Sequence, residues 1–142
     1  MTPDASSSLP AGAAPFLPVQ DRVAQQPQAS TALRTVDTTL TYGELNARAN
    51  QLARRLGGGP PTSGPVGICL ERGAEAVVAL LGVLRSGRPF LPLDPRQPAG
   101  RRRDLLDRAG ASALVTRADL WGPGSCPERP VLALDREGPQ LL

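Results

Sequence analysis

The stretch GPVGICLERGAEAVVALLGVLRSGRPFLPLDP, residues 64–95, decides the fold of this 142-residue chain. Residues 64–70 form a short apolar run without polar alternation, which is typical of a strand covered on both faces. Residues 74–86 have helical spacing, and Gly87 ends this expected helix; one stripe holds Ala74, Val77, Val78, Leu81 and Leu84. Residues 90–93 read as a second strand, which Asp94-Pro95 terminates. This order predicts a right-handed βαβ unit.

The same alternation continues toward the C-terminus. Pro98 is suited to the first position of a helix that runs to Arg108, with Gly110 beyond it. A third strand is expected at 113–116, a helical turn at 118–121 and a fourth strand at 131–135. The chain is therefore predicted to be α/β, with Rossmann-like βαβ units and a mostly parallel sheet.

Upstream of residue 64 the pattern is different. One helical face is expected over residues 16–24, formed by Phe16, Leu17, Val19, Val23 and Ala24. Residues 31–36 and 38–42 read as a hairpin that turns near Asp37. Residues 1–14 are a low-complexity leader, expected to be disordered because Ser, Pro, Gly and Ala bury little apolar surface. This leaves residues 15–142 as the folded part.

Thr41-Tyr42-Gly43-Glu44 matches a helix capping box, in which Thr41 and Glu44 satisfy each other's backbone N–H groups. The helix that follows has an apolar face of Leu45, Ala49, Leu52, Ala53 and Leu56. Its other face is expected to hold Asn46, Arg48, Asn50 and Arg54. The run of glycines and prolines at 57–61 ends it.

The composition excludes several kinds of chemistry. All 16 basic residues are Arg, so there is neither a Lys nor a His to act as a Schiff-base former, imidazole base or imidazole metal ligand. The net charge is only +3 and aromatic residues are few, which disfavours nucleic-acid binding. No apolar run approaches the ~18 residues of a membrane span, so no membrane association is expected. Cys69 and Cys126 form no CxxC pair, which favours free thiols and a cytoplasmic location.

Three constellations are candidate sites. The glycines at 57–59 follow a helix and precede a strand, which is the wrong order for a phosphate loop. Glu71 and Arg72 follow a predicted parallel strand, where α/β proteins bind ligands, although they could equally pair with each other or cap the next helix. Residues 101–103 (Arg-Arg-Arg) could contact phosphates, but a solvated helix face is favoured, with an Asp104–Arg108 pair.

The remaining polar candidates are expected to have packing roles. Cys69 lies inside an apolar strand and should behave as a small hydrophobic residue, whereas Cys126 is expected to be exposed in a loop. Tyr42 and Trp121 are interpreted as packing residues with a polar group at one end. Residue chemistry alone therefore shows no active site.

Three motifs in order resemble those of adenylate-forming enzymes, and more narrowly of nonribosomal peptide synthetase adenylation domains. They are LTYGELNARANQLA at 40–53, VGICLER at 66–72 and LLGVLRSGRPFLPLDP at 80–95. Pro98 and Arg101 match a following PxxR, and residues 109–111 and 114–116 match the next helix end and strand. Arg85 replaces the usual Lys, and Arg102 lies where an apolar residue is common.

The resemblance implies that these motifs are scaffold of an N-terminal subdomain. In the family, the phosphate loop, the amino-acid pocket, the ribose-binding Asp and the catalytic Lys all follow a strand like 131–135. No catalytic, cofactor-binding or metal-binding residue is therefore assigned in this chain, and the 142 residues alone are expected to be inactive. The complete enzyme would use ATP and Mg and load an acyl group onto a phosphopantetheine carrier protein.

Two further expectations concern the parent protein. If Met1 is the natural start, the parent is a stand-alone or initiating adenylation protein. The expected partners are the remainder of the adenylation domain and the carrier protein. The alternatives are a non-catalytic scaffolding or binding module derived from such a domain, or one half of a split enzyme.

Overall fold

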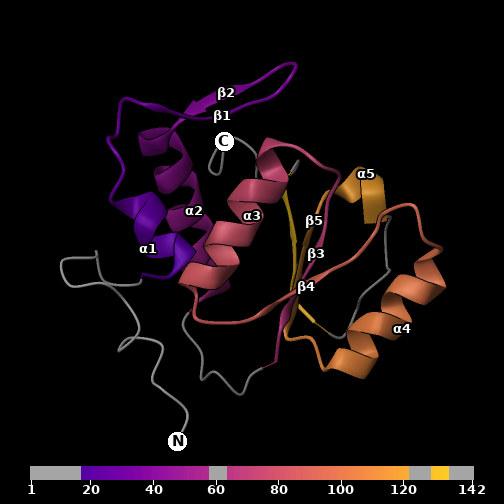
Figure 1. The fold of residues 1–142 in the computed structure, drawn as a ribbon. Helices are drawn as coiled ribbons and strands as arrows, with labels where there is room; N and C mark the ends of the chain where they lie inside the picture. Colours follow the sequence, from indigo (N-terminus) through magenta and orange to yellow (C-terminus); the bar gives the residue numbers. More distant parts are fainter. Residues whose placement is uncertain (1–16, 58–63, 122–128, 135–142) are drawn as a thin grey trace, which may run out of the picture.

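The computed structural model describes residues 17–57, 64–121 and 129–134. They form a four-stranded parallel sheet with helices on both faces, next to a separate two-stranded hairpin (Figure 1). The sheet strands are β3 (Val66–Cys69), β4 (Phe90–Pro92), β5 (Ala113–Thr116) and β6 (Val131–Ala133). Their spatial order is β4-β3-β5-β6. The predicted α/β class and the parallel sheet are confirmed.

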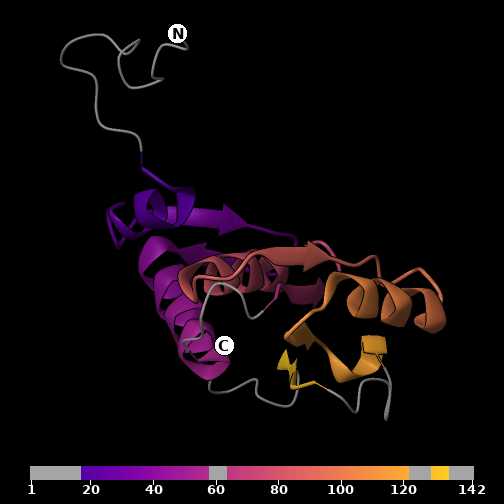
Figure 2. The same cartoon turned by 90° about the horizontal axis from the view of Figure 1, so that it is seen from below.

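One layer of helices contains α1 (Val19–Ala24), α2 (Tyr42–Leu56) and α3 (Ala74–Arg85), and the other contains α4 (Ala99–Ala109) and α5 (Ala118–Trp121). Viewed from below, the two layers lie on either side of the sheet (Figure 2). Strand β3 shows why the sheet is covered twice. Ile68 packs into the cluster shared with α2 and α3, while the next residue, Cys69, packs into the cluster shared with α4 and α5.

The predicted hairpin is confirmed. Strands β1 (Thr31–Arg34) and β2 (Thr39–Thr41) pair antiparallel, and residues 35–38 connect them. At the start of α2, the Glu44 N–H donates to Thr41 Oγ1 and the Thr41 N–H donates to Glu44 Oε1, each over 3.1 Å. These hydrogen bonds to Thr41 lower the pKa of the Glu44 carboxyl. The capping box therefore sets the point at which the hairpin ends and α2 begins.

Several predicted boundaries and faces are corrected. Helix α1 begins at Val19 rather than near residue 16, and Pro98 is the N-cap of α4 rather than its first helical residue. Val77, assigned to the buried stripe of α3, is 37% exposed. The buried side of α3 is instead centred on Val78, Ala79 and Leu81–Val83, because α3 packs against both α2 and the sheet.

Asn46 is a further correction, because it was expected on the solvent face of α2 and is buried. Its Nδ2 donates to the Val23 carbonyl of α1 over 3.2 Å, and its Oδ1 accepts from Arg85. Arg85 also donates to the Asn46 carbonyl, to Asn50 Oδ1 at 3.0 Å and to the Gln20 carbonyl at 3.2 Å. Partial burial lowers the pKa of Arg85. One guanidinium thus joins α1, α2 and α3.

The leader 1–14, Phe16 of the expected first helix, residues 58–61 of the glycine-proline run, Cys126 and residue 135 of the expected last strand lie outside the described residues. Where the remaining elements are described, they follow the predicted order. Gly110 ends α4 in the left-handed conformation at φ 65°, as a C-terminal glycine is expected to do.

Candidate functional site

β3 and β5 are the two central strands of the sheet, and the connections that leave their carboxyl ends run in opposite directions. From β3 the chain passes through α3 to β4 on one side, and from β5 it passes through α5 to β6 on the other. Ligands of open α/β sheets bind at such a point. A hollow of about 850 Å³ lies here, bordered by Arg48 of α2, by the end of β1 and the hairpin loop at 34–38, by residues 71–75, and by Arg117, Asp119 and Leu120. Glu71 and Arg72 follow parallel strand β3 at this edge, as predicted, and a ligand site there stays a prediction.

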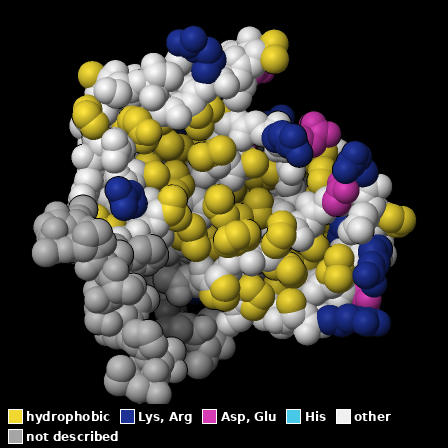
Figure 3. Space-filling view, in the orientation of Figure 1, with side chains coloured by type: hydrophobic (Ala, Val, Ile, Leu, Met, Phe, Trp, Pro, Cys, Tyr) yellow, Lys and Arg dark blue, Asp and Glu magenta, His cyan; other side chains and the backbone are white. Residues whose placement is uncertain are grey.

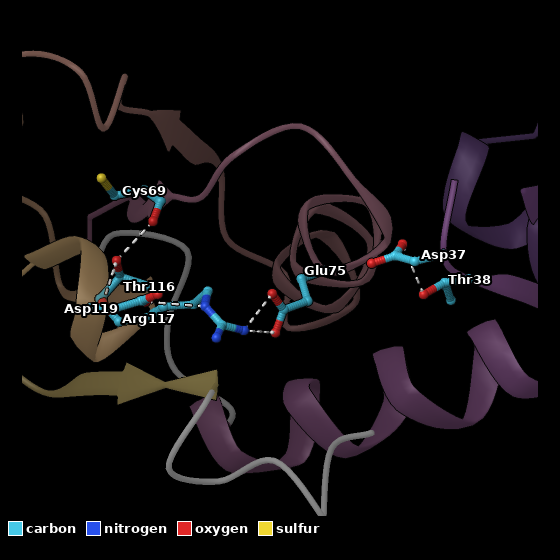
Figure 4. Close-up of polar contacts among 7 residues, drawn as sticks. All are labelled: Asp37, Thr38, Cys69, Glu75, Thr116, Arg117 and Asp119. Atoms are coloured by element: carbon cyan, nitrogen blue, oxygen red, sulfur yellow. Dashed lines mark hydrogen bonds and ion pairs between the residues drawn. The ribbon is translucent and has the colours of Figure 1, made fainter. Parts of the chain in front are cut away.

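An ion pair dominates this edge (Figure 4). Arg117, directly after β5, donates through one terminal nitrogen to both oxygens of Glu75, at 2.9 and 3.0 Å. Its Nε donates to Asp119 Oδ1 at 3.1 Å. The hydrogen bonds to Glu75 are the main reason that the pKa of Arg117 is raised. Because Glu75 lies in the first turn of α3, the pair fastens the β5–α5 turn to the start of that helix.

A second contact crosses the sheet just below this ion pair. Thr116 Oγ1 donates to the Cys69 carbonyl over 2.7 Å, and both residues are completely buried. This bond gives the buried Cys69 carbonyl a side-chain donor at the end of β3, as buried polar groups require. The ends of the two central strands are thereby held together.

On the opposite rim, the hairpin loop is held by its own hydroxyl groups. Asp37 Oδ1 accepts from Thr35 Oγ1 at 2.9 Å and from Thr38 Oγ1 at 3.3 Å. The Thr35 N–H donates to the Thr38 carbonyl over 2.7 Å. In Figure 4 this loop lies beyond Glu75 as seen from Arg117. The Asp37 carboxylate is therefore occupied in holding the turn.

A second hollow, of about 720 Å³, lies at the carboxyl ends of β3 and β4 and is lined by residues 70–72 and 92–96. Asp94 holds this turn: its Oδ1 accepts from the Arg96 N–H at 2.9 Å, and its two oxygens accept from the Arg96 guanidinium at 3.1 and 3.0 Å. The side-chain hydrogen bond with Arg96 is the main cause of the lowered pKa of Asp94. The Asp of the Pro-Leu-Asp-Pro motif thus has a local structural role.

The arginine run on α4 is only partly a solvated face. Arg101 and Arg103 are exposed, and Asp104 pairs with Arg108 at 3.0 Å as expected. Arg102 is only 6% exposed, which contradicts the solvated-face interpretation at that position. Its guanidinium lies 4.6 Å from the centre of the Trp121 ring and donates to the Leu120 carbonyl at 2.9 Å. Arg102 therefore occupies a buried position: its aliphatic carbons pack against the apolar cluster, and its planar guanidinium lies over the Trp121 ring.

The remaining candidates have packing roles. Cys69 is a buried free thiol, 3.5 Å from an Arg102 nitrogen, and Trp121 is buried in the same cluster.

Gly57 follows α2, so the glycine segment begins after a helix, as predicted. Neither Glu71 nor Arg72 caps α3, whose N-cap is Gly73 without a side-chain hydrogen bond. Both side chains are exposed at the rims of the two hollows.

Sequence reasoning missed the Glu75–Arg117 pair. The two residues are 42 positions apart, and only the adjacency of β3 and β5 brings them together. Their charged side chains at the start of a helix and directly after a strand were the available signal. Within the described ranges, no group of three or more His, Cys, Asp or Glu is placed to hold a metal ion. Most of the described carboxylates at this edge, namely Asp37, Glu75, Asp94 and Asp119, hold turns or ion pairs, and Glu71 is the exposed exception.

The fold and this edge define an α/β protein with a parallel sheet whose ordered turns border a hollow at the change of strand direction. Residues 19–140 match the family described as AMP-binding enzyme. The chain belongs to that family, and its relatives identify it with an N-terminal part of the adenylation domains of nonribosomal peptide synthetases.

A linear gramicidin synthase polypeptide of Brevibacillus parabrevis is 42% identical over 119 residues, which is 83% of this chain and 2% of that protein. Chondramide synthase cmdD of Chondromyces crocatus is 41% identical over 128 residues, 86% of this chain and 3% of that protein. The chain thus spans only a few per cent of the length of these relatives.

Solved structures agree. A crystal structure of the nonribosomal peptide synthetase FmoA3 with alpha-methyl-L-serine-AMP superposes with a TM-score of 0.69 at 31% identity, covering 82% of this chain and 13% of that chain. O-succinylbenzoate Coenzyme A synthetase of Bacillus subtilis, in complex with AMP, gives a TM-score of 0.71 at 21% identity, covering 86% and 32%, and shows the shared fold alone. No helix among the described residues is both long and apolar enough to cross a membrane.

Proposed function

We propose that residues 15–142 form part of the N-terminal subdomain of an adenylation domain that activates an amino or aryl acid. In the complete domain, a carboxylate oxygen attacks the α-phosphorus of ATP, and pyrophosphate leaves. The thiol of a carrier-protein phosphopantetheine then attacks the acyl carbon, and AMP leaves. The family match over residues 19–140 is the observation that carries this proposal.

We do not place a site for Mg·ATP on the described residues. Magnesium binds carboxylate oxygens and phosphate oxygens. At this edge of the sheet, however, Glu75 and Asp119 are hydrogen-bonded to Arg117, and Asp94 is hydrogen-bonded to Arg96, which leaves the single exposed carboxylate of Glu71 rather than a group of ligands. The proposal therefore assigns no catalytic, nucleotide or metal role to these residues. Their task is to build and order the sheet on which the rest of the domain is arranged.

A direct consequence is that the 142-residue chain alone is inactive. Purified chain should give no amino-acid-dependent exchange between ATP and labelled pyrophosphate. Measurable exchange would overturn this part of the proposal.

A chimera tests the positive part. Zwittermicin A synthase ZmaJ of Bacillus cereus is 44% identical to this chain over 85 residues, which cover 16% of that protein. Replacing the matching segment of ZmaJ with this chain's residues should retain pyrophosphate exchange with the same preferred amino acid as unaltered ZmaJ, the matched control. Two results would contradict the scaffold role: a folded chimera without exchange, or a chimera with a changed amino-acid preference.

A further inference from the structure

Helix α1 is attached to the rest of the chain in a different way from the other described helices. Each of α2, α3, α4 and α5 buries at least one side chain fully, whereas α1 buries none. Within α1 only Gln20 and Val23 are half-buried, and Val19 is 56% exposed. Hydrophobic side chains gather across the centre of the face shown in Figure 3, and α1 lies to the left of α3 in that orientation (Figure 1). Apolar burial therefore contributes little to the attachment of α1.

Two hydrogen bonds to its backbone hold α1 in place. Arg85 Nη2, from α3, donates to the Gln20 carbonyl over 3.2 Å. Asn46 Nδ2, from α2, donates to the Val23 carbonyl over 3.2 Å. Gln20 and Val23 stand at positions i and i+3, so they share one face of the helix. The Val23 side chain packs against the apolar cluster between α2, α3 and the hairpin. The main contacts of α1 thus come from a single helical turn.

The two donor side chains have other partners that fix their positions without α1. Arg85 also donates to the Asn46 carbonyl at 3.2 Å and to Asn50 Oδ1 at 3.0 Å, both on α2. Helices α2 and α3 pack against each other and against the sheet through clusters whose buried members include no residue of α1. A hollow of about 350 Å³ lies beside Arg85 and Asn46, and residue 24 of α1 is part of its border. Departure of α1 would widen this hollow and expose two donors, and it would leave the apolar core in place.

The chain that follows α1 is fastened separately. The Gln28 carbonyl accepts from the Gly43 N–H and the Ser30 carbonyl accepts from the Tyr42 N–H, each over 2.9 Å. These bonds satisfy two N–H groups in the first turn of α2, which have no partner within that helix. Residues 25–27, between these bonds and α1, have exposed side chains. A movement of α1 can therefore stop at residues 25–27 without disturbing the hairpin or α2.

We propose that α1 is a detachable helix, which leaves α2 and α3 as one unit by rotation about residues 25–27 while the rest of the described chain stays folded. In the closed state α1 supplies the Gln20 and Val23 carbonyls to Arg85 and Asn46. In the open state these two side chains present their N–H groups to solvent, at the border of the hollow. The proposal concerns contacts within the described residues, so it is independent of the proposed function.

Hydrogen exchange of the 142-residue chain at increasing urea concentrations, below those that unfold it, tests the proposal. The amides of residues 22–25 should be protected only about 10- to 100-fold relative to an unfolded peptide, because few contacts must be broken. This protection should change little with urea, since detachment of α1 exposes little surface. The amides of β3 and β5 should be more strongly protected and should lose protection steeply as urea is added. Equal protection and equal urea dependence in α1 and β3 would overturn the proposal.

A matched pair of proline variants separates α1 from the cooperative core. Ala24 in α1 and Ala47 in α2 are both exposed, and both border the same hollow. A proline at position 24 clashes with the Gln20 carbonyl, which is the acceptor of Arg85. Ala24→Pro should therefore remove the protection of α1, while protection in β3 and β5 falls by no more than the factor that α1 has lost. Ala47→Pro should lower protection in β3 and β5 by at least about 100-fold or prevent folding.

The outcomes of these variants are decisive in both directions. If Ala24→Pro unfolds the chain, or lowers protection in β3 beyond that limit, α1 belongs to the cooperative core and the proposal is wrong. An equally small effect of Ala47→Pro would also contradict it, because α2 would then be no more essential to the fold than α1. Retention of the folded core in Ala24→Pro, together with its loss in Ala47→Pro, supports detachment of α1 as a unit.

Discussion

Gly82 lies on the buried side of α3, at its contact with α2. Replacing it with Ala has two opposing effects on the free energy of unfolding, since Ala favours the helix but crowds the contact. A Cβ atom at this position would lie 2.8 Å from Leu52 Cδ2 and 2.9 Å from both Leu52 Cβ and Leu52 Cγ. The end of the Leu52 side chain could rotate away, but its Cβ is fixed to the backbone of α2. The two helices must therefore move apart by several tenths of an ångström.

The magnitude follows from these two effects. Ala is preferred over Gly within a helix by about 1 kcal/mol. Overpacking a dense core costs about 1–3 kcal/mol. Leu52 is completely buried, which leaves it no room to relax, so the cost is expected to be in the upper part of this range. We expect Gly82→Ala to lower the free energy of unfolding by about 1–2 kcal/mol.

Urea unfolding of the dilute 142-residue chain, followed by far-UV circular dichroism, provides the measurement. Gly100→Ala is the matched control, because Gly100 is in α4 with nothing within 4 Å of its added Cβ, and it should stabilise slightly. In a Leu52→Ala background the added methyl group has space, so Gly82→Ala should become neutral or stabilising. The reasoning is refuted if Gly82→Ala alone is as stable as the original chain, or if its effect is unchanged by Leu52→Ala.

The remaining predictions concern charged side chains. Arg102→Ala should lower the free energy of unfolding by about 2–4 kcal/mol by removing a buried stem. Arg102→Met should cost much less, and Trp121 fluorescence should report the lost stacking in both variants; an equal cost for both would show that the charge, not the packing, matters. Arg85→Lys should destabilise by about 1–2 kcal/mol in urea unfolding, because an ammonium cannot reach the acceptor oxygens on both α1 and α2 at once. A Lys variant of undiminished stability would contradict that role. The lowered pKa values of Glu44 and Asp94 predict stabilisation that is complete above the pKa values of the unfolded chain and lost as the pH falls below about 4. Glu44→Gln with Asp94→Asn should therefore flatten stability against pH in this acidic range, and an unaltered slope would count against both assignments.

Local signals in the sequence were sufficient for much of the fold. The capping box at 41–44, the apolar run at 64–70 that contains β3, and the glycine at 110 each determine local backbone structure through nearby residues, and the sequence predicts each of them. The carboxyl edge of the sheet was also predicted from the position of Glu71 and Arg72. Helical periodicity failed for α3 because this helix is covered on two sides, so no single stripe describes its buried face.

The polar residues that determine tertiary contacts were less predictable. Asn46 and Arg102 are buried because Arg85 and Trp121, distant in sequence, supply their partners. The Glu75–Arg117 pair depends on the order of the strands, which periodicity does not reveal. One signal pointed to Arg102, namely its place where the family resemblance expects an apolar side chain.

The attachment of α1 has a thermodynamic consequence. This helix buries none of its side chains fully, and it is fastened by hydrogen bonds from Arg85 to the Gln20 carbonyl and from Asn46 to the Val23 carbonyl. Heat-capacity changes come mainly from the exposure of apolar surface. Detachment of α1 should therefore carry a small heat-capacity change, so the free energy of detachment should vary almost linearly with temperature. The free energy of unfolding of the sheet and its apolar layers should instead be a curved function of temperature. On cooling, the N-terminal helix should keep its attachment as the apolar layers around the sheet weaken.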